Sequence, residues 1–238
     1  MGANRAGLIA FDAPGGRKPL GSGTLIGPRH VLTANHVLKG EPLAFRLEGY
    51  DFVSVNVVWR NPDLDVALLV ADQEIRGYAN PQWLTDISDR DRWSAWGYPK
   101  TTNQNSSTDE QVAMGWAAPC PPHQTALVLT VDAPPQVWAG MSGAGVWIGG
   151  KLAGVIIEAL EGFSGKQLQA TPVAQFVDDL EFRLALGFDP RQPSPILAGA
   201  GVHAPDALAL PAHATHAHHL VARFQVVDFI GREDAQRQ

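Results

Sequence analysis

Short apolar or alternating segments recur along most of the chain, and polar stretches rich in Asp, Asn, Gln and Pro separate them. Such segments are typical of strands. They fall into two clusters on either side of a break at 72–92. The spacing predicts an all-β protein of about twelve strands, arranged as paired barrels or as a sandwich. The segments are GLIAF (7–11), SGTLIG (22–27), HVLTA (30–34), LAFRLE (43–48), FVSVNVVW (52–59), VALLV (66–70), WSAWGY (93–98), QVAMGW (111–116), ALVLTV (126–131), GAGVWI (143–148) and KLAGVIIEAL (151–160).

One helix is expected near the end of this β region. Thr171 followed by Pro172 is typical of an N-cap and a first helical position. Gly187 would end the helix. The apolar residues between them share one helical face: Val173, Phe176, Val177 and Leu180.

The composition changes after residue 189, where Pro, Ala, Gly and His dominate without a sustained period. The expected organisation is therefore one domain at 1–188, a linker at 189–221 and the start of a further segment at 222–238. Within the domain, the first strand cluster covers about 5–75 and the second about 92–187.

Composition and charge narrow the class of protein. The chain has 238 residues, of which 45% are hydrophobic and 18% charged, which is typical of a globular domain. The net charge is -6 and no run of Lys or Arg occurs, so neither nucleic acid nor an anionic membrane is an expected partner.

Targeting signals and disulfides are not expected either. The single cysteine, Cys120, cannot form an internal disulfide, and its place between prolines favours an inert side chain. The N-terminus lacks a secretory pattern, Ala6 breaks the myristoylation pattern, and no apolar run reaches the length of a membrane span. A cytoplasmic location is the expectation.

Three local contexts carry candidate chemistry. His36 follows a buried strand, Asp65 precedes the apolar run VALLV, and Ser142 lies among glycines in GMSGAGVW (140–147). A serine hydroxyl is a poor nucleophile unless a base accepts its proton and a carboxylate orients that base. Glycines beside it would let backbone N–H groups point toward a reacting oxyanion. Asp63 competes with Asp65 for the carboxylate role, and each of the three residues could instead be an ordinary turn or core residue.

These motifs resemble those of the chymotrypsin/trypsin-like serine peptidases in their compact bacterial form. GTLIGPRHVLTANHV (23–37) resembles the family's strand, turn and histidine segment, DLDVALL (63–69) its aspartate segment, and GMSGAGVW its nucleophile segment. KLAGVI (151–156) resembles the strand that lines the substrate cleft. The resemblance covers about 5–187 and implies two six-stranded β-barrels with the active site at their junction.

The resemblance implies a role for each matching residue. Ser142 attacks the scissile carbonyl, His36 acts as base and then acid, and Asp65 orients His36. The N–H groups of Gly140 and Ser142 form the oxyanion hole. The residues expected to bind substrate are Gln136, Ile157 and Glu158. No metal or organic cofactor is implied, and the substrate is a peptide or protein.

Some positions depart from the family's pattern. Met141 stands where secreted members have an Asp that pairs with a new N-terminus, so that route of activation is not expected. Gln136 stands near the trypsin specificity position, so selectivity for Arg or Lys is not supported. Ile157 stands where the family often has a Ser that touches the triad Asp.

Two features near the end of the chain suggest further roles. Four histidines could suggest a metal site, but their Ala-rich surroundings favour a flexible tract: His213, His216, His218 and His219. The segment Asp228–Glu233 resembles the start of the nucleotide-binding module of STAND-type NTPases. That resemblance implies an N-terminal effector switched on by assembly of the NTPase, although a short exposed C-terminal segment explains these six residues equally well.

Two other functions stay open at this point. An α/β-hydrolase would use GMSGA as a nucleophile elbow, but that fold needs a helix directly after the serine. A catalytically inactive peptidase-like module that binds peptides or a partner is the other alternative. The sequence favours the serine endopeptidase, because residues of all three triad types are present.

Overall fold

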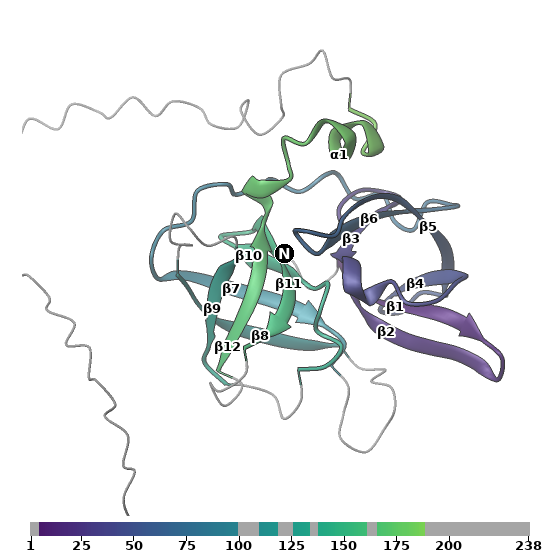
Figure 1. Cartoon of the computed structure of the whole chain (residues 1–238), viewed down its shortest axis with the longest axis horizontal. Coiled ribbons are helices and arrows are strands. Elements are labelled where there is room, and N and C mark those ends of the chain that lie inside the picture. Colours follow the sequence, from purple (N-terminus) through teal and green to yellow (C-terminus); the bar gives the residue numbers. More distant parts are fainter. Residues whose placement is uncertain (1–4, 100–109, 119–125, 134–137, 161–165, 189–238) are drawn as a thin grey trace, which may run out of the picture. The chain divides into compact units, whose positions relative to one another are not determined.

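The computed structural model describes residues 5–99, 110–118, 126–133, 138–160 and 166–188. The predicted linker at 189–221, the segment 222–238, Cys120 and Gln136 lie outside these ranges. The described strands form two closed six-stranded barrels in which neighbouring strands are antiparallel (Figure 1). The prediction of two six-stranded barrels is confirmed, and the α/β-hydrolase alternative is wrong because a strand rather than a helix follows Ser142.

Barrel one is built from the first strand cluster. Its strands are joined in the order β1-β2-β3-β6-β5-β4. Apolar side chains at alternate positions, among them Ile9, Leu25 and Leu69, fill its interior. The strands are β1 (Ala6–Ala13), β2 (Gly16–Leu25), β3 (His30–Ala34), β4 (Leu43–Leu47), β5 (Val53–Asn61) and β6 (Val66–Ala71).

Barrel two follows the polar break and closes in the order β10-β11-β12-β9-β8-β7. Trp93, Leu129 and Val146 are among the buried residues of its core. The strands are β7 (Asp91–Gly97), β8 (Gln111–Ala118), β9 (Leu127–Val131), β10 (Gly145–Ile148), β11 (Lys151–Ala159) and β12 (Gln167–Pro172).

The C-terminal part of barrel two differs from the prediction. Thr171 and Pro172 end strand β12 instead of starting a helix. A 3-10 turn at Val173–Gln175 follows. The only α-helix among the described residues, α1, is short and spans Leu180–Ala185. Its N-cap is Asp179, whose side chain accepts a hydrogen bond from the Phe182 N–H at 2.8 Å. Gly187 follows the helix with a φ of 81°, as expected.

A third apolar cluster joins the barrels. It combines Leu32 and Trp59 of barrel one, Val155 of barrel two, and Phe182 of α1. The rings of Trp59 and Phe182 pack edge to face with centroids 4.9 Å apart. Burying a side chain the size of phenylalanine contributes about 2–3 kcal/mol. The helix that follows barrel two therefore packs on barrel one and holds the two barrels together (Figure 1).

Candidate active site

His36 lies directly after strand β3, in a single 3-10 turn at Asn35–Val37. Val31, Leu32 and Ala34 of β3 are fully buried, and Val37 is 3% exposed. The turn leaves the His36 side chain 42% exposed. The apolar residues on both sides anchor the turn in barrel one, while the imidazole faces outward.

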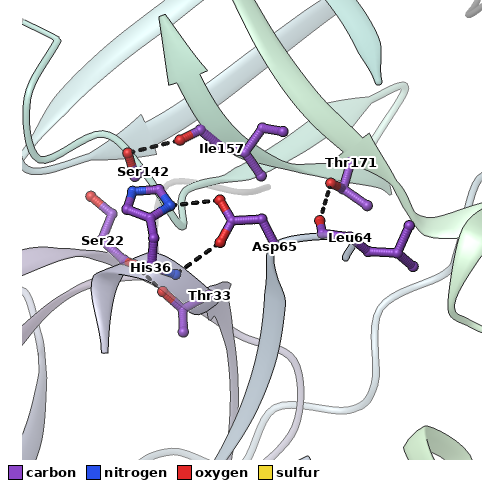
Figure 2. Close-up of polar contacts among 8 residues, drawn as sticks. All are labelled: Ser22, Thr33, His36, Leu64, Asp65, Ser142, Ile157 and Thr171. Carbon is purple, nitrogen blue, oxygen red and sulfur yellow. Dashed lines mark hydrogen bonds and ion pairs between the residues drawn. The ribbon is translucent and has the colours of Figure 1, made fainter. Parts of the chain in front are cut away.

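Asp65 lies just before strand β6, and strand pairing brings it to His36. Ala34 at the end of β3 pairs with Val66 at the start of β6. The Asp65 Oδ2 lies 2.6 Å from the His36 Nδ1, and the Asp65 Oδ1 accepts a hydrogen bond from the His36 N–H at 2.8 Å (Figure 2). The Asp65 carbonyl also accepts from the Asn35 N–H at 3.0 Å.

These bonds define how the imidazole can act. A carboxylate at Nδ1 favours the tautomer that carries its proton there, which leaves Nε2 as the basic nitrogen. Asp65 has a φ of 53°, a left-handed conformation uncommon for a residue other than glycine. Asp63 makes no bond to His36 among the described hydrogen bonds, so the geometry favours Asp65 for the carboxylate role.

Ser142 lies in the loop before strand β10. Gly140 and Gly143 on either side have φ values of 100° and 91°, which other residues rarely adopt. The Ser142 hydroxyl donates to the Ile157 carbonyl at 3.1 Å (Figure 2). No hydrogen bond between Ser142 and His36 occurs in the part of the chain that is described, because the hydroxyl proton is directed to Ile157.

The backbone N–H groups of this loop, and of Gly145 at the start of β10, fall into two sets. Four are bonded: Met141 to the Trp138 carbonyl, Gly143 to the Ile156 carbonyl, Ala144 to the Met141 carbonyl and Gly145 to the Thr24 hydroxyl. The N–H groups of Gly140 and Ser142 have no partner among the described residues. These are the two N–H groups expected to form an oxyanion hole, and no described residue occupies either of them.

His36, Asp65 and Ser142 line one open pocket of about 370 Å³. Ile157 and Glu158 of β11, both predicted to bind substrate, line the same pocket. The pocket's other lining residues are Trp138, Ala139 and Ala159, so its walls combine a large aromatic ring with small side chains. Gln136, the third predicted substrate-binding residue, lies outside the described residues.

Sequence reasoning missed several hydroxyl side chains that hold this arrangement. The Ser22 hydroxyl of barrel one donates to the Gly140 carbonyl in the nucleophile loop, and the Thr33 hydroxyl donates to the Ser22 carbonyl. The Thr171 hydroxyl donates to the Leu64 carbonyl at 2.6 Å, next to Asp65 (Figure 2). A signal was present, because Ser22, Thr24 and Thr33 occupy inward positions of apolar strands, where a polar group needs a partner.

Within the described ranges, no three His, Cys, Asp or Glu side chains lie close enough together to hold a metal ion. The predicted flexible tract around His216 lies outside these ranges.

Among the described helices, none has the length and hydrophobicity that a membrane span requires.

Comparison with known proteins places these observations in context. The family model of the trypsin-like peptidase domain matches residues 21–155, more than half of the chain. A comparison with curated protein sequences gave no match.

Several solved protease structures share the fold. The active form of the Rv3671c protease from M. tuberculosis has a TM-score of 0.60 and 17% identity, over 81% of this chain and 84% of that one. The HtrA-type protease AlgW, solved with a decapeptide, has a TM-score of 0.59 and 18% identity, over 78% and 64%. The serine endoprotease from Yersinia pestis has a TM-score of 0.59 and 20% identity, over 76% and 64%. This chain thus spans slightly less than two thirds of the latter two.

Proposed function

Since the chain belongs to the trypsin-like peptidase family, we propose that it is a serine endopeptidase that uses Ser142, His36 and Asp65. The observation that carries the proposal is the pair of hydrogen bonds between Asp65 and His36, one at the ring Nδ1 and one at the backbone N–H. Both residues line a pocket that Ser142 also lines. The N–H groups of Gly140 and Ser142, which have no partner among the described residues, support an oxyanion hole in the same loop.

The proposed reaction proceeds through an acyl-enzyme. The Ser142 hydroxyl turns from the Ile157 carbonyl to the His36 Nε2, transfers its proton there and attacks the scissile carbonyl. The tetrahedral oxyanion is bound by the N–H groups of Gly140 and Ser142, each of which contributes about 3–4 kcal/mol in comparable sites. His36 then gives its proton to the leaving amine, and a water molecule releases the acyl group by the same steps.

A peptidase-like binding module is the second candidate. The observation that favours it is the Ser142 hydroxyl, which bonds to the Ile157 carbonyl and not to His36. If that rotamer persists when a peptide binds, His36 cannot take the proton and no acyl-enzyme forms. The two candidates therefore make opposite predictions for a single substitution.

The test compares the wild-type chain with Ser142→Ala. We expect the wild type to cleave casein or a peptide library and to be labelled on Ser142 by a fluorophosphonate probe. Ser142→Ala should lose labelling and lower kcat by at least about 10⁴-fold, because loss of a serine nucleophile removes the covalent route. Equal cleavage by both proteins would overturn the endopeptidase. Peptide binding without any cleavage or labelling of the wild type would favour the binding module.

We also propose that an NTPase module regulates this activity inside the cytoplasm. The support is the resemblance of Asp228–Glu233 to the start of such a module, together with Met141. A methionine has no carboxylate to pair with a newly formed N-terminus, and Met141 instead packs in the core of barrel two, where it is 2% exposed. Low activity of the purified chain, raised by a partner, is expected. Full activity of the chain alone would contradict this regulation.

A further inference from the structure

Ser22 of strand β2 is a fully buried polar residue at the contact between the two barrels. Its exposed fraction is 0%, although it carries a hydroxyl. The backbones approach closely here: a Cβ added at Gly143 would lie 2.0 Å from the Ser22 carbonyl oxygen. Ser22 thus belongs to barrel one in sequence but lies against the nucleophile loop of barrel two.

Each polar group of Ser22 has a partner. The hydroxyl donates to the Gly140 carbonyl at 2.6 Å and accepts from the Tyr98 N–H at 2.9 Å. The Ser22 N–H donates to the Ser142 carbonyl at 2.9 Å, and the Ser22 carbonyl accepts from the Thr33 hydroxyl at 2.8 Å. A backbone N–H can only donate, so the bond from Tyr98 occupies a lone pair of the Ser22 oxygen, and the single hydroxyl proton goes to Gly140.

The two carbonyls that bond to Ser22 belong to Gly140 and Ser142. These are the same residues whose N–H groups have no partner among the described residues. Gly140 lacks a Cβ, so nothing in its own covalent structure confines it to its φ of 100°. A bond at its carbonyl restricts rotation about the same Cα and thereby the direction of its N–H.

We propose that Ser22 is a positioning residue that orients the oxyanion-binding N–H groups of Gly140 and Ser142 from the opposite barrel. The inference rests on the proposed function, because an oxyanion forms only if Ser142 attacks a carbonyl. Ser22→Ala removes the bond to Gly140 but keeps the backbone bond to Ser142, so the loop loses one of the two bonds that it receives from Ser22.

The strand itself supplies a matched control. Thr24 lies two residues further along β2, is 1% exposed, and accepts a hydrogen bond from the Gly145 N–H at 2.6 Å. Thr24→Val removes an equally buried hydroxyl that also bonds barrel two, but at a residue beyond the nucleophile loop. A purely structural role of the Ser22 hydroxyl would therefore be matched by Thr24→Val.

The experiment measures kcat and KM on a peptide substrate, the inhibition constant of the matching peptide aldehyde, the affinity for the product peptide, and Tm. We expect Ser22→Ala to lower kcat by about 10- to 100-fold, somewhat less than the loss of a whole oxyanion donor. The aldehyde should bind more weakly by the same factor, since its adduct places an oxyanion in the hole. KM and product affinity should change less than about threefold, because they do not depend on the hole.

The controls separate the outcomes. Thr24→Val should keep kcat within about threefold of the wild type while lowering Tm about as much as Ser22→Ala. Ser22→Cys keeps a weak donor and should fall between wild type and Ser22→Ala, and it replaces Ser22→Ala if the latter does not fold. Equal kcat losses in Ser22→Ala and Thr24→Val, or unchanged aldehyde binding, would overturn the proposal. A wild type no more active than Ser142→Ala would instead overturn the proposed function and this inference with it.

Discussion

His36 and Asp65 of barrel one hold each other, whereas Gly140 and Ser142 of barrel two are held by residues of the opposite barrel. Asp65 bonds to the ring and to the backbone N–H of His36, and strand pairing supplies the proximity. The loop that carries Ser142 has two glycines in left-handed conformations and depends on Ser22 for its orientation. Side chains next to paired strand ends are positioned by the strand pairing itself. A loop that exposes backbone N–H groups cannot use those groups for its own hydrogen bonds, so other bonds must fix its conformation.

Substitutions in the His36–Asp65 pair and in the nucleophile loop should therefore affect catalysis and stability differently. Changes to the barrel-one pair should alter catalysis with little effect on folding, because the pair is partly exposed. Changes to the nucleophile loop should alter both, because the same bonds that orient the loop also join the barrels.

The largest effect is expected for Asp65→Asn. The amide keeps the size of the side chain but favours the wrong tautomer of His36 and cannot stabilise its charged form, so kcat should fall by about 10⁴-fold. Tm should change by no more than a few degrees. Asp63→Asn is the control, since Asp63 is exposed and makes no bond to His36 among the described residues. A comparable loss of kcat in both variants would show that the bonds to Asp65 do not matter.

Gly143→Ala should produce the next largest effect, and it should be a loss of stability. The new Cβ would lie 2.0 Å from the Ser22 carbonyl oxygen, and the φ of 91° disfavours any side chain. Together these should cost about 2–5 kcal/mol of unfolding free energy, measured by denaturant unfolding. Gly149→Ala is the control, because Gly149 has a φ of 56° but nothing within 4 Å of an added Cβ. If Gly149→Ala costs as much, the close approach of the barrels contributes nothing.

The smallest effect concerns a second contact between the barrels. The Tyr98 hydroxyl of barrel two donates to Glu48, just after β4 of barrel one, at 3.2 Å. Glu110 lies nearby, and burial followed by the Glu48 charge raises the pKa of Glu110 to about 7. One Glu110 carboxyl oxygen, Oε1, is buried without a hydrogen-bond partner among the described residues, as suits a neutral carboxyl group.

Because the pKa of Glu110 is higher in the folded chain than in the unfolded chain, its neutral form favours folding. That contribution is complete below the unfolded pKa and is lost as the pH rises through about 7. Glu110→Gln stays neutral, so its Tm relative to wild type should rise from about pH 4.5 to about pH 7, between the unfolded and folded pKa values, and level off above that. Thermal unfolding of both proteins across this range measures the difference. A Tm difference that does not change with pH would contradict the assignment.

The sequence was sufficient for most of the fold because eleven strand segments carry their own apolar pattern. HVLTA, for example, coincides with β3 at His30–Ala34. The missed strand, β12, alternates Gln with small or apolar residues, and its pattern is weak without the neighbouring strands β9 and β11. Thr171 and Pro172 have the residue types of a helix start, but pairing with β11 outweighed that local preference.

For the site, the sequence by itself determined which residue types were available, and in which order, because His36, Asp65 and Ser142 each lie in a recognisable local context. Only the tertiary structure decided what restrains them. The bond from the Ser22 hydroxyl to Gly140 spans 118 residues of sequence, and the Ser142 hydroxyl meets Ile157 only because β11 lies beside the loop. Side-chain burial follows a local period that can be read along the chain, whereas a hydrogen bond depends on distance and angle between groups that closure of the barrels brings together.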